Sequence, residues 1–516
     1  MREAHQRRLQ PPAVPPGRRA SATALTATTK AATVFTTYES LYVGGAWVAP
    51  SSPGMIKVTS PNTGTLIGRV PEAVESDVDA AVAAARQAFD DPLGWSRWEP
   101  AKRADAIERF CTALDARTDE MAVRVSAQNG MPIAISRRVE GHLPQAMLRY
   151  YAELLRTGQL EFDSERAGAL GGRIKVSRRP VGVVGAIIPW NVPQTIGAHK
   201  YGPALAMGCT LVIKPSPETV LDAQLFAEAA DEAQLPPGVI NVVPGGPRTG
   251  AYLVTHPGVD KIAFTGSEKV GRWVAETAGR MLRPVTAELG GKGAAIVLDD
   301  VDLAGDLASF YYATLLNNGQ SCYLGTRILA PALRYDEIVG TVTDFVGSLE
   351  VGSSLDPATR VGPLATAQQR DRVEQYIAKG IAEGAHLTTG GGRPRGQAQG
   401  WFVEPTVFAD VDNRSTIGQE EIFGPVLSII RYRDIDEAVR IANDSPFGLG
   451  GTVWSPDVER AAAVAERVDT GVIGINGFLP DPAGPFSGTK NSGIGRELGP
   501  EGLDAYQILK TTYLPR

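Results

Sequence analysis

Cys322 lies in a stretch whose residue types favour exposed backbone over a packed core. It follows the run NNGQS at 317–321, whereas a cysteine that only fills space is usually flanked by apolar residues. Most lone cysteines are small core residues, and only an accessible thiol of low pKa acts as a nucleophile. The flank favours a reactive thiol, but residues elsewhere in the chain must decide.

Two other residues could assist a thiol nucleophile. Glu288 lies between an apolar run and a Gly-Gly turn, where burial would raise the pKa of its carboxyl group towards the range of a general base. Asn191 lies between Trp190 and Pro193, and its amide could donate to an oxyanion. Taken singly, an acid in a loop is usually solvated and such an asparagine usually caps local backbone, so both interpretations stay open.

Two strand ends could hold a dinucleotide. Segment 261–279 has the pattern of a strand, a Gly-Ser turn and a helix, and Gly266 and Gly271 would let backbone approach a phosphate at the helix N-terminus. Lys214 follows a buried apolar strand, where its ammonium group could bind ribose hydroxyls or a phosphate. A structural glycine turn and a solvated lysine are the alternatives, because no G-x-G-x-x-G fingerprint occurs in a strand-helix context.

The composition indicates a large globular protein without an electrostatic footprint for nucleic acid or anionic membrane. The chain has 516 residues, which predicts two or three domains, and a net charge of −6. Its three cysteines are scattered and no CxxC or HxxxH spacing occurs, so we expect a reducing, cytoplasmic compartment and no structural metal. The apolar runs fall well short of the ~20 residues that a membrane-spanning helix needs.

Strand and helix patterns alternate from about residue 38, which predicts an α/β fold with parallel sheets. The pattern restarts after about residue 290, which indicates a second α/β unit. Residues 156–180 could form a hairpin arm or a linker. Residues 1–37 are rich in Arg, Pro, Ala and Thr and are expected to be disordered. A transit peptide is disfavoured because the prolines would break its helix.

With these features together, the chain resembles the NAD(P)-dependent aldehyde dehydrogenase superfamily over residues 38–516. Seven ordered motifs are far more specific than any single one. They are PWN at 189–191, KPS at 214–216, FTGS at 264–267 with Gly271, ELGGK at 288–292, GQSC at 319–322, EEIFGPV at 420–426 and PFSGTKNSGIGRELG at 485–499.

The resemblance implies a reaction at Cys322. Its thiolate would attack the aldehyde carbon while Asn191 and the Cys322 backbone N–H stabilise the oxyanion, and hydride transfer to the nicotinamide would leave a thioester. Glu288 would activate the water that hydrolyses the thioester to the carboxylic acid. The implied partners are a small-molecule aldehyde and NAD, with NADP possible; no metal, nucleic acid or membrane is expected.

The resemblance also implies a set of cofactor contacts. Lys214 would bind the adenosine ribose, Ser267 the pyrophosphate and Glu421 the nicotinamide ribose. Phe423 would form a wall of the nicotinamide pocket. The complete implied set is Ile188, Pro189, Trp190, Lys214, Ser216, Gly246, Phe264, Gly266, Ser267, Glu288, Leu289, Gly290, Glu421 and Phe423.

Three structural units follow from the resemblance. They are a Rossmann-type cofactor-binding α/β domain at 38–157 and 180–290, a catalytic α/β domain at 291–488, and a small β oligomerisation arm at 158–179 and 489–516. An unpaired edge strand in the arm is the physical reason to expect a homodimer or homotetramer.

One departure from the family pattern concerns the coenzyme. Where many NAD-preferring relatives have an acid three residues after the lysine, this chain has Pro217, with Glu218 one step later. An acid there would accept a hydrogen bond from the 2′-hydroxyl and repel a 2′-phosphate. Its displacement weakens discrimination against NADP, and NAD remains the favoured coenzyme.

Three other functions remain as alternatives. A coenzyme A-acylating dehydrogenase does not need Glu288 to activate water, and a catalytically silent oligomer does not need the cysteine, the acid and the amide together. A Cys-His hydrolase would need a histidine partner that no sequence context suggests.

The residues expected along the substrate tunnel predict a medium-sized apolar or aromatic aldehyde. They are Val192, Ile196, Tyr323, Phe478 and Leu479.

Overall fold

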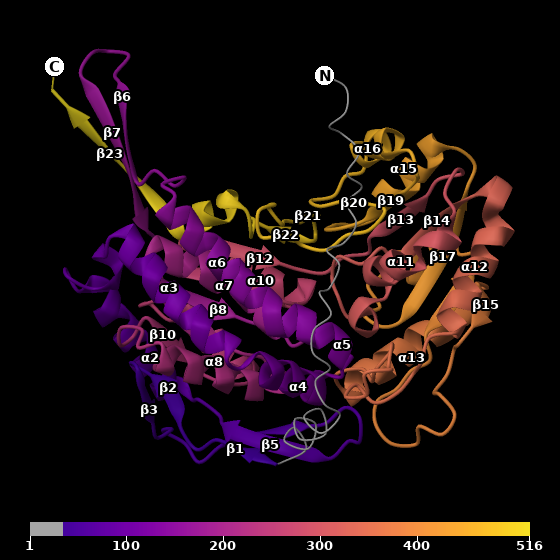
Figure 1. The fold of residues 1–516 in the computed structure, drawn as a ribbon, viewed down its shortest axis with the longest axis horizontal. Helices are drawn as coiled ribbons and strands as arrows, with labels where there is room; N and C mark the ends of the chain where they lie inside the picture. The colour runs from indigo at the N-terminus through magenta and orange to yellow at the C-terminus, as the bar shows by residue number, and fades with distance from the viewer. Residues whose placement is uncertain (1–34, 516) are drawn as a thin grey trace, which may run out of the picture.

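The computed structural model describes residues 35–515, which contain an eight-stranded sheet, a seven-stranded sheet and three smaller ones (Figure 1). Residues 1–34 of the predicted extension lie outside the described residues. Strand β1 (Thr36–Thr37) pairs in parallel with β5 (Leu66–Pro71), which also pairs with β4 (Met55–Thr59). The prediction of disorder was therefore wrong for residues 36 and 37, because the edge of β5 offers their backbone hydrogen-bond partners.

The eight-stranded sheet has a parallel centre, as predicted for an α/β fold. Its order is β22-β12-β11-β8-β9-β10-β2-β3, and each neighbouring pair from β12 to β10 is parallel. Its strands are β2 (Leu41–Val43), β3 (Ala46–Val48), β8 (Val183–Ile187), β9 (Thr210–Lys214), β10 (Ile240–Val242), β11 (Lys261–Thr265), β12 (Val285–Glu288) and β22 (Gly493–Ile494).

Helices cover both faces of this sheet. They are α2 (Glu75–Asp90), α3 (Pro100–Asp115), α4 (Thr118–Asn129), α5 (Ile133–Ser136), the π-helix η2 (Arg137–His142), α6 (Leu143–Arg156), α7 (Pro193–Met207), α8 (Leu221–Glu232), α9 (Pro247–Thr255) and α10 (Glu268–Arg280). Alternate strand residues point to opposite faces, so Val184 and Leu211 pack with α3, α6, α7 and α8, whereas Val183 and Ile262 pack with α2, α9 and α10. Burial on both faces explains why these strands are continuous apolar runs.

The seven-stranded sheet is the second α/β unit that the sequence predicts. Its order is β15-β16-β17-β14-β13-β19-β20, and only the β15–β16 pair is antiparallel. Its strands are β13 (Ala294–Val297), β14 (Arg327–Pro331), β15 (His386–Thr389), β16 (Thr406–Ala409), β17 (Val426–Tyr432), β19 (Thr452–Trp454) and β20 (Gly474–Ile475). The helices in this part of the chain are α11 (Leu307–Thr314), α12 (Tyr335–Gly347), α13 (Ala367–Ala382), α14 (Thr416–Gln419), α15 (Ile435–Asn443) and α16 (Val458–Ala465).

The segment around 156–180 forms a hairpin arm rather than a linker. β6 (Asp163–Ala167) and β7 (Arg173–Pro180) pair with the C-terminal strand β23 (Gln507–Leu514) in an antiparallel sheet that projects from the body (Figure 1). The rest of 489–516 does not join the arm. β22 pairs with β12, and β21 (Thr489–Lys490) pairs with β18 (Phe447–Gly448).

The fold class is thus confirmed as α/β, while the domain limits stay a prediction. Within residues 35–515, no helix combines the length and the apolar character needed to cross a membrane.

Candidate active site

The loop that carries Cys322 is held in an unusual backbone conformation. Asn317, Asn318 and Gly319 follow α11 with successive φ values of 54°, 60° and 71°, all in the left-handed region. A Cβ on Gly319 would lie 2.1 Å from the Gly424 carbonyl oxygen, so only glycine fits there. Asparagine tolerates this region better than most residues, which is a physical reason for the NNG sequence.

The polar residues before Cys322 are buried, contrary to the expectation of exposed backbone. Asn318 donates from Nδ2 to the carbonyl oxygens of Gly130 (2.9 Å) and Pro363 (3.0 Å). The Gln320 Oε1 accepts a hydrogen bond from the Ala365 N–H at 3.0 Å. These amides join the loop to surrounding segments, so the polar run braces the cysteine instead of exposing it to solvent.

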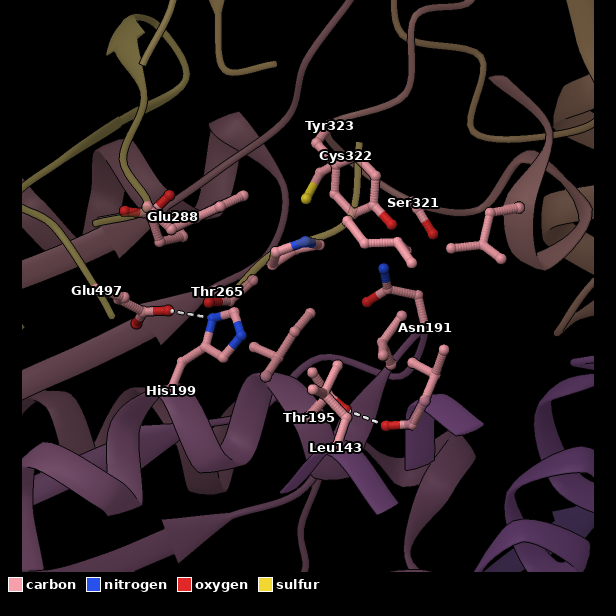
Figure 2. Close-up of a pocket in the computed structure, with 17 residues that line it drawn as sticks. Leu143, Asn191, Thr195, His199, Thr265, Glu288, Ser321, Cys322, Tyr323 and Glu497 are labelled. Atoms are coloured by element: carbon pink, nitrogen blue, oxygen red, sulfur yellow. Dashed lines mark hydrogen bonds and ion pairs between the residues drawn. The ribbon is translucent and has the colours of Figure 1, made fainter. Parts of the chain in front are cut away.

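Cys322 lies in the wall between two cavities. The larger cavity, of about 290 Å³, lies on the predicted cofactor side; it is lined by Pro189, Trp190, Asn191, Thr265, Gly266, Ser267, Leu289, Gly290, Cys322, Gln369, Arg372, Glu421 and Phe423. The smaller one, of about 50 Å³, is shown in Figure 2; it is lined by Val139, Leu143, Asn191, Val192, Thr195, Ile196, His199, Thr265, Glu288, Leu316, Ser321, Cys322, Tyr323, Leu479, Pro480, Phe486 and Glu497. A thiol in this position can contact ligands from both sides.

Asn191 is fixed at the start of α7 with its amide beside the cysteine loop. Its carbonyl oxygen accepts from the side-chain amides of Asn129 (3.1 Å) and Asn317 (2.9 Å). Its own Nδ2 donates to the Gln320 carbonyl oxygen at 2.9 Å, which leaves the second N–H of that amide available. Figure 2 shows the amide directed towards the part of the cavity where the Cys322 sulfur lies. The geometry suits a donor to an oxyanion that forms on a carbon bound to Cys322.

Burial raises the pKa of the Cys322 thiol, and the charges of Glu421 and Glu288 raise it further. No cation among the described residues contributes to lowering it. A positively charged ligand next to Cys322 would lower the pKa of this thiol, as nucleophilic cysteines require.

Glu288 ends strand β12 and is buried, with 2% of its surface exposed. Neither carboxylate oxygen has a hydrogen-bond partner among residues 35–515. Burial raises the pKa of this carboxyl well above its usual value, as the sequence predicted; the charge of Glu497 raises it further, and Lys200 offsets part of the shift. A buried, unpaired carboxyl beside a cysteine is suited to accept a proton from water.

A buried ion pair next to Glu288 was not predicted. Lys200 donates from Nζ to Glu497 Oε1 and to Thr265 Oγ1, both at 2.6 Å. Burial alone would raise the pKa of Glu497, but Lys200 and His199 outweigh it and lower the pKa to about 2. A signal for Lys200 existed, because HK at 199–200 lies in a helix that is mostly apolar and almost entirely buried. Glu497 lies within the motif at 485–499, but the motif gave it no role, and it reaches the cluster through tertiary packing.

Lys214 lies at the end of β9 and is buried, so the alternative of a solvated lysine was wrong. Its Nζ donates to the carbonyl oxygens of Pro215 (2.8 Å) and Gly245 (2.6 Å). Burial lowers the pKa of Lys214 to about 8. An ammonium group has three N–H donors, so one remains for a ligand hydroxyl.

The acid that Pro217 displaces is nevertheless present near Lys214. The Ser216 hydroxyl donates to the Glu218 carboxylate, and Glu218 and Glu72 are the carboxylates whose charge favours the protonated form of Lys214. This side of the site therefore carries negative charge, which the sequence left uncertain.

The Gly-Ser turn before α10 has the geometry predicted for it, with one correction. Ser267 is the N-cap residue in extended conformation, its side chain makes no capping hydrogen bond, and it lines the larger cavity at the N-terminus of α10. Contrary to the prediction, Gly271 does not serve to let the backbone approach a phosphate. A Cβ there would lie 2.2 Å from Leu289 Cδ2, so this glycine is needed for packing of α10 on Leu289.

Glu421 is placed by the two glycines after Glu288. The Gly291 N–H donates to Glu421 Oε1 at 2.9 Å, and a Cβ on Gly290 would lie 2.5 Å from Glu421 Oε2. Burial raises the pKa of Glu421 to about 7. A Cβ on Gly291 would lie 2.3 Å from the Cys322 carbonyl oxygen, so the same turn also sets the position of the cysteine loop.

Aromatic and cationic side chains complete the cofactor side. Phe423, with φ of 60°, packs edge to face against Trp190 with ring centroids 5.4 Å apart. Gln369 donates to the Phe423 carbonyl oxygen (2.8 Å) and Arg372 to that of Glu421 (2.8 Å). Both come from α13, which no motif marked.

Most of the predicted cofactor residues line the larger cavity. Glu288 lines the smaller cavity instead, and five others line neither. They are Ile188, Lys214, Ser216, Gly246 and Phe264. Among residues 35–515, no group of His, Cys, Asp and Glu is arranged to hold a metal ion.

The chain matches the model of the aldehyde dehydrogenase family over residues 47–512. It is 53% identical over 477 residues to a geranial dehydrogenase of Castellaniella defragrans, covering 92% of this chain and 99% of that protein. It is also 40% identical to a 3-succinoylsemialdehyde-pyridine dehydrogenase of a Pseudomonas species, covering 92% of this chain and 98% of that protein.

Solved structures share the fold over nearly the whole chain. A Mycobacterium tuberculosis aldehyde dehydrogenase complexed with NAD+ has a TM-score of 0.90 at 48% identity, covering 93% of this chain and 99% of that one. A mutant aldehyde dehydrogenase C from Pseudomonas syringae, complexed with NAD+ and octanal, has a TM-score of 0.88 at 40% identity, covering 92% and 96%. This protein is therefore a member of the aldehyde dehydrogenase family.

Proposed function

We propose that the protein oxidises an aldehyde to the carboxylic acid with NAD as hydride acceptor. The observation that carries this proposal is the position of Cys322 between two cavities, with a free amide N–H of Asn191 on the same side and the unpaired carboxyl of Glu288 across the smaller cavity. One cavity would hold the aldehyde and the other the nicotinamide ring, so that the reacting carbon lies between them.

The residues on the cofactor side fit a dinucleotide. Gly290 leaves room for Glu421 beside the larger cavity, Ser267 opens α10, and Lys214 keeps one N–H for a ribose hydroxyl. Bound NAD would supply a hydride acceptor and a positive charge next to Cys322, which favours the thiolate.

The first half-reaction forms an acyl group on the cysteine. The Cys322 sulfur attacks the aldehyde carbon, and the resulting oxyanion accepts hydrogen bonds from the Asn191 amide and the Cys322 N–H. One such donor contributes roughly 10²- to 10³-fold to turnover. Departure of hydride leaves a thioester on Cys322.

The second half-reaction hydrolyses the thioester. Glu288 removes a proton from water as the water oxygen bonds to the acyl carbon, and the carbon–sulfur bond breaks to release the acid and the Cys322 thiolate. Buried Glu288, with no competing hydrogen bonds, favours this outcome over transfer to coenzyme A, which has no use for a water-activating carboxyl.

NAD is favoured over NADP because of Glu218. Its carboxylate lies within reach of the Ser216 hydroxyl and near Lys214, where a 2′-phosphate would meet negative charge. Glu218 thus has the role that, in many relatives, belongs to an acid at the position of Pro217.

An apolar aldehyde of medium length is the substrate class that the smaller cavity favours. Val192, Ile196, Tyr323 and Leu479 line it, and Phe478 packs edge to face on Tyr323 with centroids 5.1 Å apart. No arginine or lysine among the described residues lines this cavity. The names of the relatives, one acting on geranial and one bound to octanal, support the same class.

The test is the rate of NADH formation, followed by absorbance, with octanal, geranial, benzaldehyde and succinate semialdehyde, beside Cys322→Ala. Turnover of about 1–10³ per second is typical of enzymes. We expect octanal or geranial to give the highest kcat/KM with NAD and the variant to be inactive. A higher kcat/KM for succinate semialdehyde would contradict the substrate class, and an active Cys322→Ala would contradict the mechanism.

We also propose a cytoplasmic homo-oligomer. All three cysteines are free, as in a reducing compartment, and the arm has two edge strands, with Leu509 and Tyr513 of β23 exposed. Light scattering should give the mass of a dimer or tetramer, and Leu509→Arg should lower that mass. A wild-type protein with the mass of a monomer would contradict the proposal.

A further inference from the structure

His199 is a buried histidine that the proposed reaction does not yet use. It lies on α7 beside Lys200 and lines the smaller cavity together with Glu288 and Cys322 (Figure 2). Its Nδ1 is 3.2 Å from Glu497 Oε2, and its ring packs at 5.9 Å from that of Phe486. Its Nε2 is buried and has no hydrogen-bond partner among the described residues.

The contact with Glu497 fixes the tautomer of His199. Glu497 is ionised because Lys200 neutralises it, and an ionised carboxylate can only accept, so Nδ1 carries the hydrogen. In the neutral imidazole, Nε2 then has a free lone pair. Lys200 donates to Glu497 and Thr265, so in the cluster of His199, Lys200 and Glu497 the basic atom without a partner among the described residues is Nε2 of His199.

We propose that His199 accepts the proton that Glu288 removes from the hydrolytic water; this inference rests on the proposed function. Glu288 takes the proton as the carbon–oxygen bond forms and the carbon–sulfur bond breaks. A water in the cavity, which has room for it at about 50 Å³, passes the proton from Glu288 to Nε2. Glu288 is thereby an unprotonated base again, and His199 gives up the proton to water that enters the cavity after the acid has left.

The charges beside His199 bear on this transfer. It leaves the net charge of the cluster unchanged, because a neutral acid and a neutral imidazole become a carboxylate and an imidazolium. The ionised Glu497, 3.2 Å from Nδ1, offsets the cost of the new buried cation. The other titratable groups that face this cluster are Lys261 of β11, Tyr151 of α6, Tyr506 of the 3-10 helix Pro500–Tyr506, Cys322 and Tyr323.

The experiment separates acylation of Cys322 from deacylation. In His199→Asn, the amide nitrogen can replace the Nδ1 donor to Glu497, but no basic atom remains. In rapid-mixing experiments with octanal and NAD, we expect one NADH per active site at the wild-type rate, followed by a steady rate at least about tenfold lower than wild type. Imidazole at fixed pH should accelerate the slow phase of the variant and leave the wild type unchanged.

Several results would overturn the inference. They are an unchanged steady rate, equal slowing of both phases, and a slow phase that imidazole does not accelerate. The last result would mean that the loss of steady rate comes from a misplaced Glu497. His199→Gln is the second variant if the first does not fold, with the same expected burst and slow phase. An activated ester, p-nitrophenyl acetate, acylates the thiol without coenzyme and reports deacylation independently. Slow ester deacylation in the variant supports the inference even if no aldehyde is oxidised, whereas wild type that produces no NADH refutes the proposed function alone.

Discussion

Replacing Glu288 by Gln should separate the two half-reactions. The change keeps the size of the side chain and removes its ability to take a proton. Both carboxylate oxygens are buried without hydrogen-bond partners among the described residues, so no hydrogen bond between those residues is lost. Because general-base help is worth roughly 10²- to 10⁴-fold, we expect thioester hydrolysis to slow by that factor while the first NADH still forms.

The pH dependence gives a second, independent readout of Glu288. A base acts when it is unprotonated, and burial holds the pKa of this carboxyl well above its usual value. Deacylation by the wild type should therefore increase as pH rises through that raised pKa, rather than near pH 4.5 as for an exposed carboxyl. Glu288→Gln should lose this limb.

The assay is rapid mixing of enzyme, NAD and octanal, followed at the absorbance of NADH between pH 5.5 and 9 (about the range where His and raised carboxyls titrate). Glu276→Gln is the control, because Glu276 is an exposed residue of α10 paired only with Arg280. A Glu288→Gln variant whose steady rate stays within twofold of wild type would refute the assignment of the base (general-base losses are about 10² or more).

Four further predictions concern the coenzyme and stability. Gly290→Ala should weaken NAD binding by about tenfold or more, measured by calorimetry, because its Cβ would lie 2.5 Å from Glu421 Oε2 and displace that carboxylate; unchanged affinity would mean that Glu421 does not contact the coenzyme. Lys214→Met should weaken NAD binding by roughly 10-fold, and Glu218→Gln should raise kcat/KM with NADP more than with NAD; a variant at Glu218 with an unchanged NAD-to-NADP ratio would contradict its role. Burial raises the pKa of Glu140 to about 8, so the folded protein keeps a proton that the unfolded chain has released between pH 4.5 and 8, and stability to urea should fall as pH rises through this window; in Glu140→Gln this dependence should be weaker, and equal slopes would contradict it.

The fold could be predicted because its strands are read directly from the sequence. Burial on both faces makes strands such as Val183–Ile187 and Thr210–Lys214 uninterrupted apolar runs, and their polar ends mark where ligands bind. The arm was harder to recognise, because β23 is mostly exposed, β7 is mostly half-buried, and neither carries such a run. The path of residues 489–494 was assigned to the wrong sheet, since strands of two residues have no sequence pattern of their own.

The site was predicted where motifs lie next to the reacting groups and missed where tertiary packing brings residues in. Cys322, Asn191 and Glu288 each stand in a marked turn, and the structure brings them around one cavity. The roles of Glu497 and Arg372 depend on which segments fold over the cavity. The meaning of Gly271 also differed, because a glycine that allows packing on Leu289 looks the same in sequence as one that allows a phosphate to approach.

The raised pKa of Cys322 is better understood as a property of the site than as a conflict with its role. Two carboxyls, Glu288 and Glu421, border the thiol, and each would be repelled by a thiolate. The same carboxyls are suited to later tasks, one to activate water and the other to bind a ribose. A permanent cation that lowered the pKa of Cys322 would also hold Glu288 in an ion pair and remove it as a base. A charge supplied by bound NAD would avoid this, because NAD would lose that charge on accepting hydride. In the proposed mechanism the site therefore favours a thiolate before oxidation and a free carboxylate base after it, with no change in the protein's own charges beyond the proton that His199 is proposed to pass on.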